Sequence, residues 1–267
     1  MKIIPVTSDG LVDLDWLAVS LKDDDRSSLI SVMMVNNETG IVQPIKQIVD
    51  LARAHGNAQT HTDAVQAAGR LDIDMDALGV DYLSLSAHKC GGPMGAGALV
   101  YNHDKIRMLK PILKGGGQER SRRSGTENAS AIAGFGLAAA LAMQDLAVFE
   151  KINAWREEAE GKMLDAVPKA IIFGQNAPRV ANTIQISLPD IRAETQLMAL
   201  DLEGIAVSSG SACSSGSIKP SHVLLAMGAS EGEATGALRI SMGWNTKREE
   251  LDRFVDVWIK MARGHGF

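Results

Sequence analysis

The chain has 267 residues, of which 45% are hydrophobic and 22% are charged, and its formal net charge is −5. This composition is typical of a folded globular protein and excludes disordered, collagen-like and fibrous classes. The negative net charge argues against a general electrostatic grip on nucleic acid or on an anionic membrane. The longest apolar run near a strand signal, residues 29–35, is too short to span a bilayer, and the N-terminus lacks the apolar segment of a signal peptide. We therefore expect a cytoplasmic protein.

The first half of the chain alternates strand-like and helix-like segments. Residues 29–35 predict a buried strand, and residues 44–55 predict an amphipathic helix that begins at Pro44 and stops at Gly56. Two further strands are expected to end at Asp63 and at Ser86. Strand–helix–strand order favours right-handed crossovers and a mainly parallel sheet, in which ligands bind beyond the carboxyl ends of the strands. The polar residues at these strand ends are therefore candidates for one site.

The second half predicts a long helical region and then a different alternation of elements. Residues 129–167 read as one long helix or as two helices joined by a bend, so we expect a domain boundary near residue 145. The last helix opens at residues 246–249 with the spacing of a capping box. Between these helices we expect strands at residues 181–188, 205–208 and 237–242 and helices at residues 194–203 and 219–227.

A lysine at the end of an apolar strand suggests covalent chemistry. Lys89 follows such a strand, and placing its amine there is costly unless it has a partner or a reaction to perform. With Asp63 at the end of a neighbouring strand and Gln66 three residues later, the residues match what pyridoxal phosphate requires: a lysine, an anion for the ring nitrogen and amide donors for the ring oxygen. Asn37 supplies another amide. The bland alternatives are a solvated lysine, a helix-capping Asp63 and an Asn37 that only turns the chain.

Other polar residues have functional and structural interpretations side by side. Cys213 is flanked by Gly and Ser, which predicts an exposed, mobile loop and an accessible thiol rather than a packed one. Cys90, by contrast, reads as a small residue at a turn. Arg239 lies on the strand face opposite Leu238 and Ile240, where it suits a substrate carboxylate or a surface ion pair. The arginine-rich run at residues 120–128 precedes a helix and suits either a phosphate site or a subunit interface.

Taken together, these segments resemble motifs of the cysteine desulfurases of the NifS/IscS group, in family order and over essentially the whole chain. The resemblance implies an α/β fold, that of the fold type I transferases that depend on pyridoxal phosphate (PLP). It implies a PLP-binding large domain with a mainly parallel sheet over residues 1–145, and a smaller α+β C-terminal domain over residues 146–267 that carries the Cys213 loop. The matching stretches are residues 35–40, 63–66, 84–89, 115–119, 123–128, 208–214, 219–224 and 237–241.

The resemblance also implies how the cofactor is held. Lys89 would form the Schiff base with pyridoxal 5'-phosphate, and Asp63 would pair with the pyridine nitrogen. Asn37 and Gln66 would bond the ring oxygen. The phosphate would be held by Ser86 and His88, and by Thr126 acting on the cofactor of the neighbouring subunit in a homodimer.

The implied reaction is the removal of sulfur from L-cysteine. Arg239 and Asn37 would bind the substrate, and Lys89, His88 and Cys213 would be the catalytic residues. Cys213 would attack the substrate sulfur, which leaves L-alanine and a persulfide. The persulfide would serve a sulfur acceptor or an iron–sulfur scaffold protein, in cluster assembly or tRNA thiolation. We expect no direct nucleic-acid or membrane partner.

One departure from the family pattern bears on activity. Family members carry, before the Asn-Asn-Glu motif, a Thr-containing phosphate loop and a histidine that stacks on the cofactor ring. Residues 1–28 contain no histidine and no Gly-rich turn of that kind. We therefore expect an N-terminally incomplete large domain with exposed apolar surface on its sheet.

Three alternatives remain open. The chain is either an inactive desulfurase-like protein that binds sulfur-transfer partners, or another fold type I lyase or aminotransferase, which would not need Cys213. A third alternative is a hydrolytic zinc site made by His61, Asp63 and His88, because two imidazoles and a carboxylate suit that metal. The zinc site would leave Lys89 and Gln66 unused.

Overall fold

The computed structural model describes residues 1–23, 26–103, 110–209 and 219–266. Within these residues the chain forms two compact units. Unit 1 comprises residues 1–16, 35–43 and 147–267, and unit 2 comprises residues 17–34 and 44–146. The two PLP-enzyme domains expected over residues 1–145 and 146–267 remain a prediction, because the units are defined by packing and not by what they bind.

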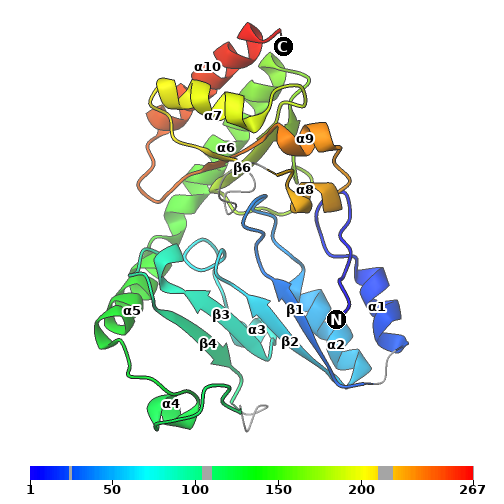
Figure 1. Cartoon of the computed structure of the whole chain (residues 1–267), viewed down its shortest axis with the longest axis vertical. Coiled ribbons are helices and arrows are strands. Elements are labelled where there is room, and N and C mark those ends of the chain that lie inside the picture. The colour runs from blue at the N-terminus through cyan, green and yellow to red at the C-terminus, as the bar shows by residue number, and fades with distance from the viewer. Residues whose placement is uncertain (24–25, 104–109, 210–218, 267) are drawn as a thin grey trace. The chain divides into compact units, whose positions relative to one another are not determined.

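Unit 2 is built on a four-stranded sheet in the order β1-β2-β3-β4 (Figure 1). Strands β1 (Ser28–Met33), β2 (Ala58–Asp63) and β3 (Tyr82–Ser86) are parallel, whereas β4 (Gly97–Tyr101) pairs antiparallel with β3. The expectation of a mainly parallel sheet is therefore confirmed. The sequence pattern did not predict β4, because its Gly and Ala residues weaken the strand signal.

One face of this sheet is covered and the other is open. Helix α2 (Ile45–His55) packs beside β2 and buries Ile45, Ile48, Val49 and Ala52, while Ile30, Val32 and Leu83 are buried on the strands. As predicted, α2 ends at Gly56, whose φ of 89° is left-handed. On the opposite face, Leu29, Met33 and Leu99 are exposed.

The predicted helical region at residues 129–167 is two helices. Helix α5 (Ala129–Gln144) and helix α6 (Leu146–Ala166) are separated by a break at Asp145. Among the described residues no single helix is long and apolar enough to cross a membrane, although α5 and α6 taken together pass that test by length and composition. The remaining helices at and before α5 are α1 (Leu14–Lys22), α3 (Met75–Leu78), the 3-10 turn η1 (Ala87–Lys89) and α4 (Gln118–Ser121).

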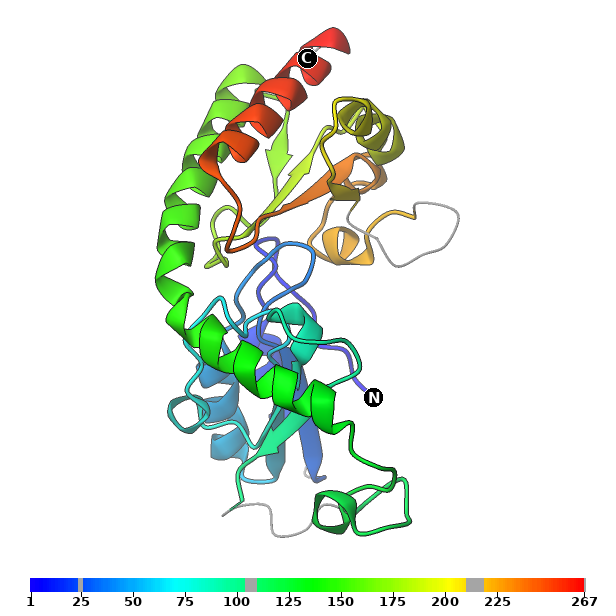
Figure 2. The same ribbon diagram turned by 90° about the vertical axis from the view of Figure 1, so that its left-hand side faces the viewer.

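Unit 1 contains an antiparallel sheet in the order β5-β6-β8-β7. Figure 2 shows α6 and α10 (Arg248–Gly264) running side by side along it. The strands are β5 (Ile171–Ile172), β6 (Thr183–Ser187), β7 (Ser208–Ser209) and β8 (Ala237–Ser241), and the other helices are α7 (Ala193–Leu202), α8 (His222–Ala226) and α9 (Glu231–Thr235).

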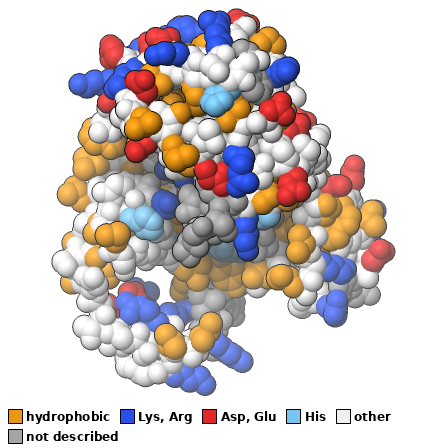
Figure 3. Space-filling model, turned by 45° about the horizontal axis from the view of Figure 1, so that its top comes forward, with side chains coloured by type: hydrophobic (Ala, Val, Ile, Leu, Met, Phe, Trp, Pro, Cys, Tyr) orange, Lys and Arg blue, Asp and Glu red, His pale blue; other side chains and the backbone are white. Residues whose placement is uncertain are grey.

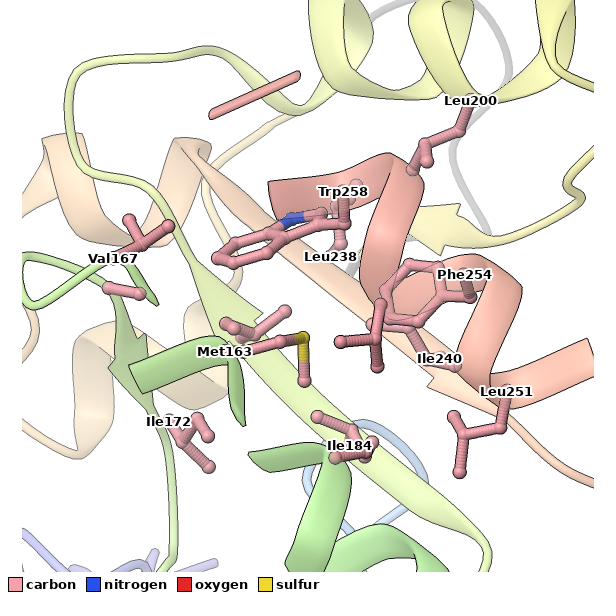
Figure 4. Packing of buried hydrophobic residues seen from close by; sticks show 14 of the residues in the cluster. Met163, Val167, Ile172, Ile184, Leu200, Leu238, Ile240, Leu251, Phe254 and Trp258 are labelled. Carbon is pink, nitrogen blue, oxygen red and sulfur yellow. The ribbon is translucent and has the colours of Figure 1, made fainter. Parts of the chain in front are cut away.

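The core of unit 1 forms where α6, α7 and α10 meet the sheet (Figure 4). Trp258 on α10 is fully buried, and Met163, Ile184, Leu200 and Leu238 surround it in the same cluster. Burial of these large apolar side chains contributes strongly to the free energy of folding of unit 1.

Several predicted boundaries were wrong. Helix α10 begins one residue later than expected, because Glu250 accepts the Lys247 N–H at 2.8 Å, whereas the Thr246 hydroxyl accepts the Gly243 N–H at 2.8 Å. Helix α8 begins at His222, because the Ser221 hydroxyl caps it. Strand β7 is only two residues long, and α1 was not predicted.

Charge on the surface follows the composition. Acidic and basic side chains are interspersed over the face shown in Figure 3, without one extended block of either sign.

Candidate functional site

The carboxyl ends of β2 and β3 place polar residues at one edge of the unit 2 sheet. The two strands are parallel, with Asp63 in register with Ser84, so Asp63 ends β2 where β3 continues through Ser86 into η1. The segments that follow the carboxyl ends of parallel strands are loops. Open α/β sheets bind their ligands at this edge. Asp63, Ser86, His88 and Lys89 are thus brought to one edge of the sheet.

Asp63 is half-buried, and only one of its two carboxylate oxygens accepts a hydrogen bond from the described residues. Its Oδ1 accepts the N–H of Val65 at 2.9 Å, which fixes the carboxylate at the end of the strand. Within the described part of the chain no hydrogen bond is made by its Oδ2. The alternative role of Asp63 as a helix cap does not hold, because no helix begins directly after it: the next described helix, α3, begins at Met75. A fixed carboxylate with a free oxygen is suited to a cationic ring nitrogen.

The Ser86-Ala87-His88-Lys89 segment forms the turn that follows β3. Ser86 Oγ lies 3.0 Å from His88 Nδ1, so the hydroxyl and the imidazole orient each other. Lys89 is exposed, and its amine has no hydrogen-bond or ion-pair partner among the residues that the structure describes. An unpartnered amine next to two polar side chains is available for covalent chemistry.

Gln66 and Arg70 form a second layer behind this turn. Arg70 donates to the Gln66 carbonyl at 2.6 Å, to Gln66 Oε1 at 3.2 Å and to the Lys89 carbonyl at 3.4 Å. Burial lowers the pKa of Arg70, and Cys90 partly opposes that shift. Arg70 occupies the side-chain oxygen of Gln66, so the Gln66 side chain is left with its amide N–H groups, which can only donate. A donor role for Gln66 is the one that the sequence predicts. Cys90 closes the turn and donates to the Ala87 carbonyl at 3.3 Å, which fits its structural interpretation.

Thr126 is exposed, in the segment that leads into α5. Two of the arginines before it are used within unit 2. The Arg123 guanidinium donates to the Gly125 carbonyl at 2.7 Å, and the Arg122 guanidinium lies 5.1 Å from the centre of the Tyr101 ring. The phosphate and subunit roles of this segment, including that of Thr126, stay predictions.

Asn36, Asn37 and Glu38 are neighbours in a turn of unit 1, and their side chains have three different surroundings. Asn36 Oδ1 accepts the N–H groups of Glu38 (2.8 Å) and Thr39 (3.0 Å), so Asn36 is the residue that turns the chain. Asn37 is exposed, which leaves its amide available to a ligand, and Glu38 is buried. Gly40 completes the turn with a φ of 74°, in a place where a Cβ atom would lie 2.9 Å from the Cβ atom of Thr183.

Arg239 meets this turn from β8. Its Nη1 donates to the Asn37 carbonyl at 2.9 Å, across 202 positions of sequence, and its Nε is buried without a hydrogen-bond partner in the described residues. Among the residues that the structure describes, Arg239 makes no ion pair of the kind that the surface alternative requires. A guanidinium that is fixed through Nη1 can still offer its remaining terminal N–H groups to a carboxylate ligand.

Two predictions need separate mention. Cys213 and its Gly/Ser loop lie outside the described residues. The zinc alternative finds no support, since the described residues include no group of three His, Cys, Asp or Glu side chains that could hold a metal. His61 instead bridges two strands, with Nδ1 2.8 Å from Ser31 Oγ and Nε2 3.2 Å from Ser84 Oγ.

Comparison with known proteins decides the family. Residues 1–254 match the family described as aminotransferase class-V. The chain belongs to this family. It is 40% identical over 264 residues to a protein of Arabidopsis thaliana named mitochondrial cysteine desulfurase, and the match covers 97% of this chain and 56% of that protein. It is also 42% identical over 253 residues to cysteine desulfurase NifS of Azotobacter vinelandii, covering 94% of the chain and 62% of that protein.

Solved structures agree with this assignment. The class-V chain matches a NifS-like protein from Rickettsia africae with a TM-score of 0.88 and 37% identity, over 98% of this chain and 69% of that one. The expected fold type I architecture and the resemblance to the NifS/IscS group are thereby confirmed. The chain spans less than two thirds of the length of the curated relatives named above.

Proposed function

We propose that the chain acts as a cysteine desulfurase, which converts L-cysteine to L-alanine and leaves a persulfide on Cys213. In this reaction the carbon–sulfur bond of the substrate breaks and a sulfur–sulfur bond to Cys213 forms, while the thiol proton balances the new C–H bond of alanine. The observation that carries the proposal is the unpartnered amine of Lys89, beyond β3, at the sheet edge where Asp63 ends the parallel strand β2.

The residues of unit 2 fit the cofactor of this family. Enzymes of the class-V family use pyridoxal phosphate, which when bound withdraws electrons from the Cα atom of an amino-acid substrate. Lys89 would hold it covalently, the free oxygen of Asp63 would face its ring nitrogen, and the Gln66 amide would donate to its ring oxygen. Ser86 and His88, already oriented toward each other, would bind the phosphate.

The chain's own residues would then act on the substrate. Arg239 would bind the substrate carboxylate through its unused N–H donors, and the Asn37 amide would contact the substrate and the cofactor oxygen. The Lys89 amine, once released, would carry a proton to and from the substrate.

Partners and location follow from the same proposal. We propose L-cysteine as the substrate, a homodimer to which Thr126 contributes, and a sulfur acceptor or iron–sulfur scaffold protein as the recipient of the persulfide. We propose a cytoplasmic location, whereas the Arabidopsis thaliana relative is named mitochondrial.

Absorbance and sulfide release test this function. Wild type supplied with pyridoxal phosphate should show the visible band of the lysine-bound cofactor, and Lys89→Ala should lose it, while Lys151→Ala, at an exposed position on α6, should keep it. Cys213→Ser should keep the band and stop sulfide release from cysteine. Absence of the band in the wild type would support the inactive alternative, and sulfide release by Cys213→Ser would refute the persulfide role.

A further inference from the structure

A buried carboxylate lies in the turn that carries Asn37. Glu38 is only 5% exposed, and Ser221, which is 1% exposed, donates to Glu38 Oε2 at 2.5 Å. The two residues are 183 positions apart in the sequence, and Ser221 also caps helix α8. None of the roles proposed above uses Glu38.

A neutral side chain would serve this hydrogen bond as well as a charged one. Burial raises the pKa of Glu38, while the Ser221 hydroxyl, His222 and Arg239 each act in the opposite direction. Since a glutamine oxygen would accept from Ser221 equally well, packing and hydrogen bonding alone do not require a charge here. Nearby cations stabilise a buried charge, and the two that act on the Glu38 carboxylate are His222 and Arg239.

Arg239 is the cation that shares this turn. Its guanidinium donates to the Asn37 carbonyl, the peptide group that joins Asn37 to Glu38. The Glu38 N–H on the other side of that peptide is held by Asn36. Arg239 is therefore fixed by one hydrogen bond at the Asn37–Glu38 peptide and attracted by the side chain of Glu38, while its Nε stays without a partner.

We propose that Glu38 is a positioning residue for Arg239: its buried carboxylate, held by Ser221, restrains the guanidinium so that the unused N–H donors face the carboxylate of an amino-acid substrate. The inference rests on the proposed role of Arg239 in substrate binding. It differs from a structural role, because Glu38→Gln keeps the acceptor for Ser221 and removes only the charge.

The experiment compares wild type with Glu38→Gln and with Glu203→Gln, a matched change at an exposed glutamate of unit 1. NMR measures rotation of the Arg239 guanidinium, with the signal assigned through Arg239→Lys, and steady-state kinetics are measured on protein loaded with pyridoxal phosphate. We expect Glu38→Gln to melt at or above the wild-type temperature, to rotate several-fold faster at Arg239, and to raise KM for cysteine about tenfold with a smaller change in kcat. Glu203→Gln should match wild type.

The proposal is overturned if the Arg239 guanidinium rotates as slowly in Glu38→Gln as in wild type. It is also overturned if Glu203→Gln changes the rotation rate and KM as much as Glu38→Gln does. If Glu38→Gln does not fold, Glu38→Asp keeps the charge and should leave the rotation rate within about twofold of wild type; free rotation there would also overturn it. If no protein shows desulfurase activity but Arg239 still depends on Glu38, the positioning role stands and the proposed function fails.

Discussion

A buried charge cluster in unit 1 gives the sharpest stability prediction. Glu160 on α6 accepts two hydrogen bonds from Arg179, from Nη1 at 2.7 Å and from Nη2 at 2.8 Å, and lies 3.5 Å from Arg156 Nη1. The exposed fractions of these three side chains are 4% for Arg179, 6% for Arg156 and 9% for Glu160. Glu160→Gln keeps the shape of the side chain but leaves buried Arg179 without a compensating carboxylate and buried Arg156 with only the exposed Glu157, 3.5 Å away.

The cost follows from the burial. Removing one partner of a buried ion pair costs about 3–5 kcal/mol, because the remaining charge stays desolvated. Burial already lowers the pKa of Arg156, and the positive charge of Arg179 acts in the same direction, so loss of Glu160 should lower it further. At roughly 2–4 °C per kcal/mol, the melting temperature should fall by roughly 6–20 °C.

Urea unfolding followed by tryptophan fluorescence measures this change, since Trp258 is fully buried in the core of unit 1. Glu157→Gln is the matched control, because the Glu157 side chain is 63% exposed although it also lies 3.5 Å from Arg156. That control should cost less than about 1 kcal/mol. If Glu160→Gln costs no more than Glu157→Gln, the cluster is not an effective buried pair and the reasoning is wrong.

Four further changes test other parts of the structure by the same unfolding measurement. Met163→Ala should cost about 2–5 kcal/mol, since Met163 is fully buried in the Trp258 cluster; a loss near zero would mean that the core is looser than described. Gly40→Ala should cost more than about 1 kcal/mol because of its φ of 74° and its contact with Thr183, and an unchanged stability would contradict that backbone. Gln185→Met should stabilise the protein by about 1 kcal/mol, because both polar atoms of Gln185 are buried without partners; destabilisation would reveal a partner. Since the folded-state pKa of Glu38 is raised, the folded state binds more protons than the unfolded chain, and stability should fall as pH rises from the ordinary glutamate pKa through the raised one. This fall should be missing in Glu38→Gln, and its persistence there would assign it to another group.

Periodic segments of the sequence predicted the fold well. Helix α2 and strands β1 and β8 were found close to their expected bounds, because the spacing of apolar residues and the glycine that ends a helix reflect local burial directly. The errors have a different physical origin. Helix α10 was placed one residue early because both Thr246 and Lys247 precede a glutamate at the right spacing, and only the bond from Gly243 to Thr246 decides between them.

The candidate site was predictable where its residues follow strands. Asp63 and Lys89 could be found from the strand ends, because parallel strands bring their carboxyl ends to one edge. Glu38 and Ser221 could not be found as a pair, since their contact spans 183 positions and neither residue has a local signal of its own. The one available hint was that both lie within stretches that match the family, at residues 35–40 and 219–224.

The loop that carries Asn37 shows why chain order alone cannot place a site residue. Residues 35–43 lie between β1 and α2 of unit 2 in the sequence but belong to unit 1. There the Val42 N–H donates to the Pro178 carbonyl at 2.7 Å, and the Val180 N–H donates to the Gly40 carbonyl at 2.9 Å. Arg179, between those two partners, is the residue whose side chain Glu160 holds. The buried ion pair therefore supports the backbone that fixes the Asn37 turn, so Glu160→Gln should raise amide hydrogen exchange at residues 40–42 more than Glu157→Gln does.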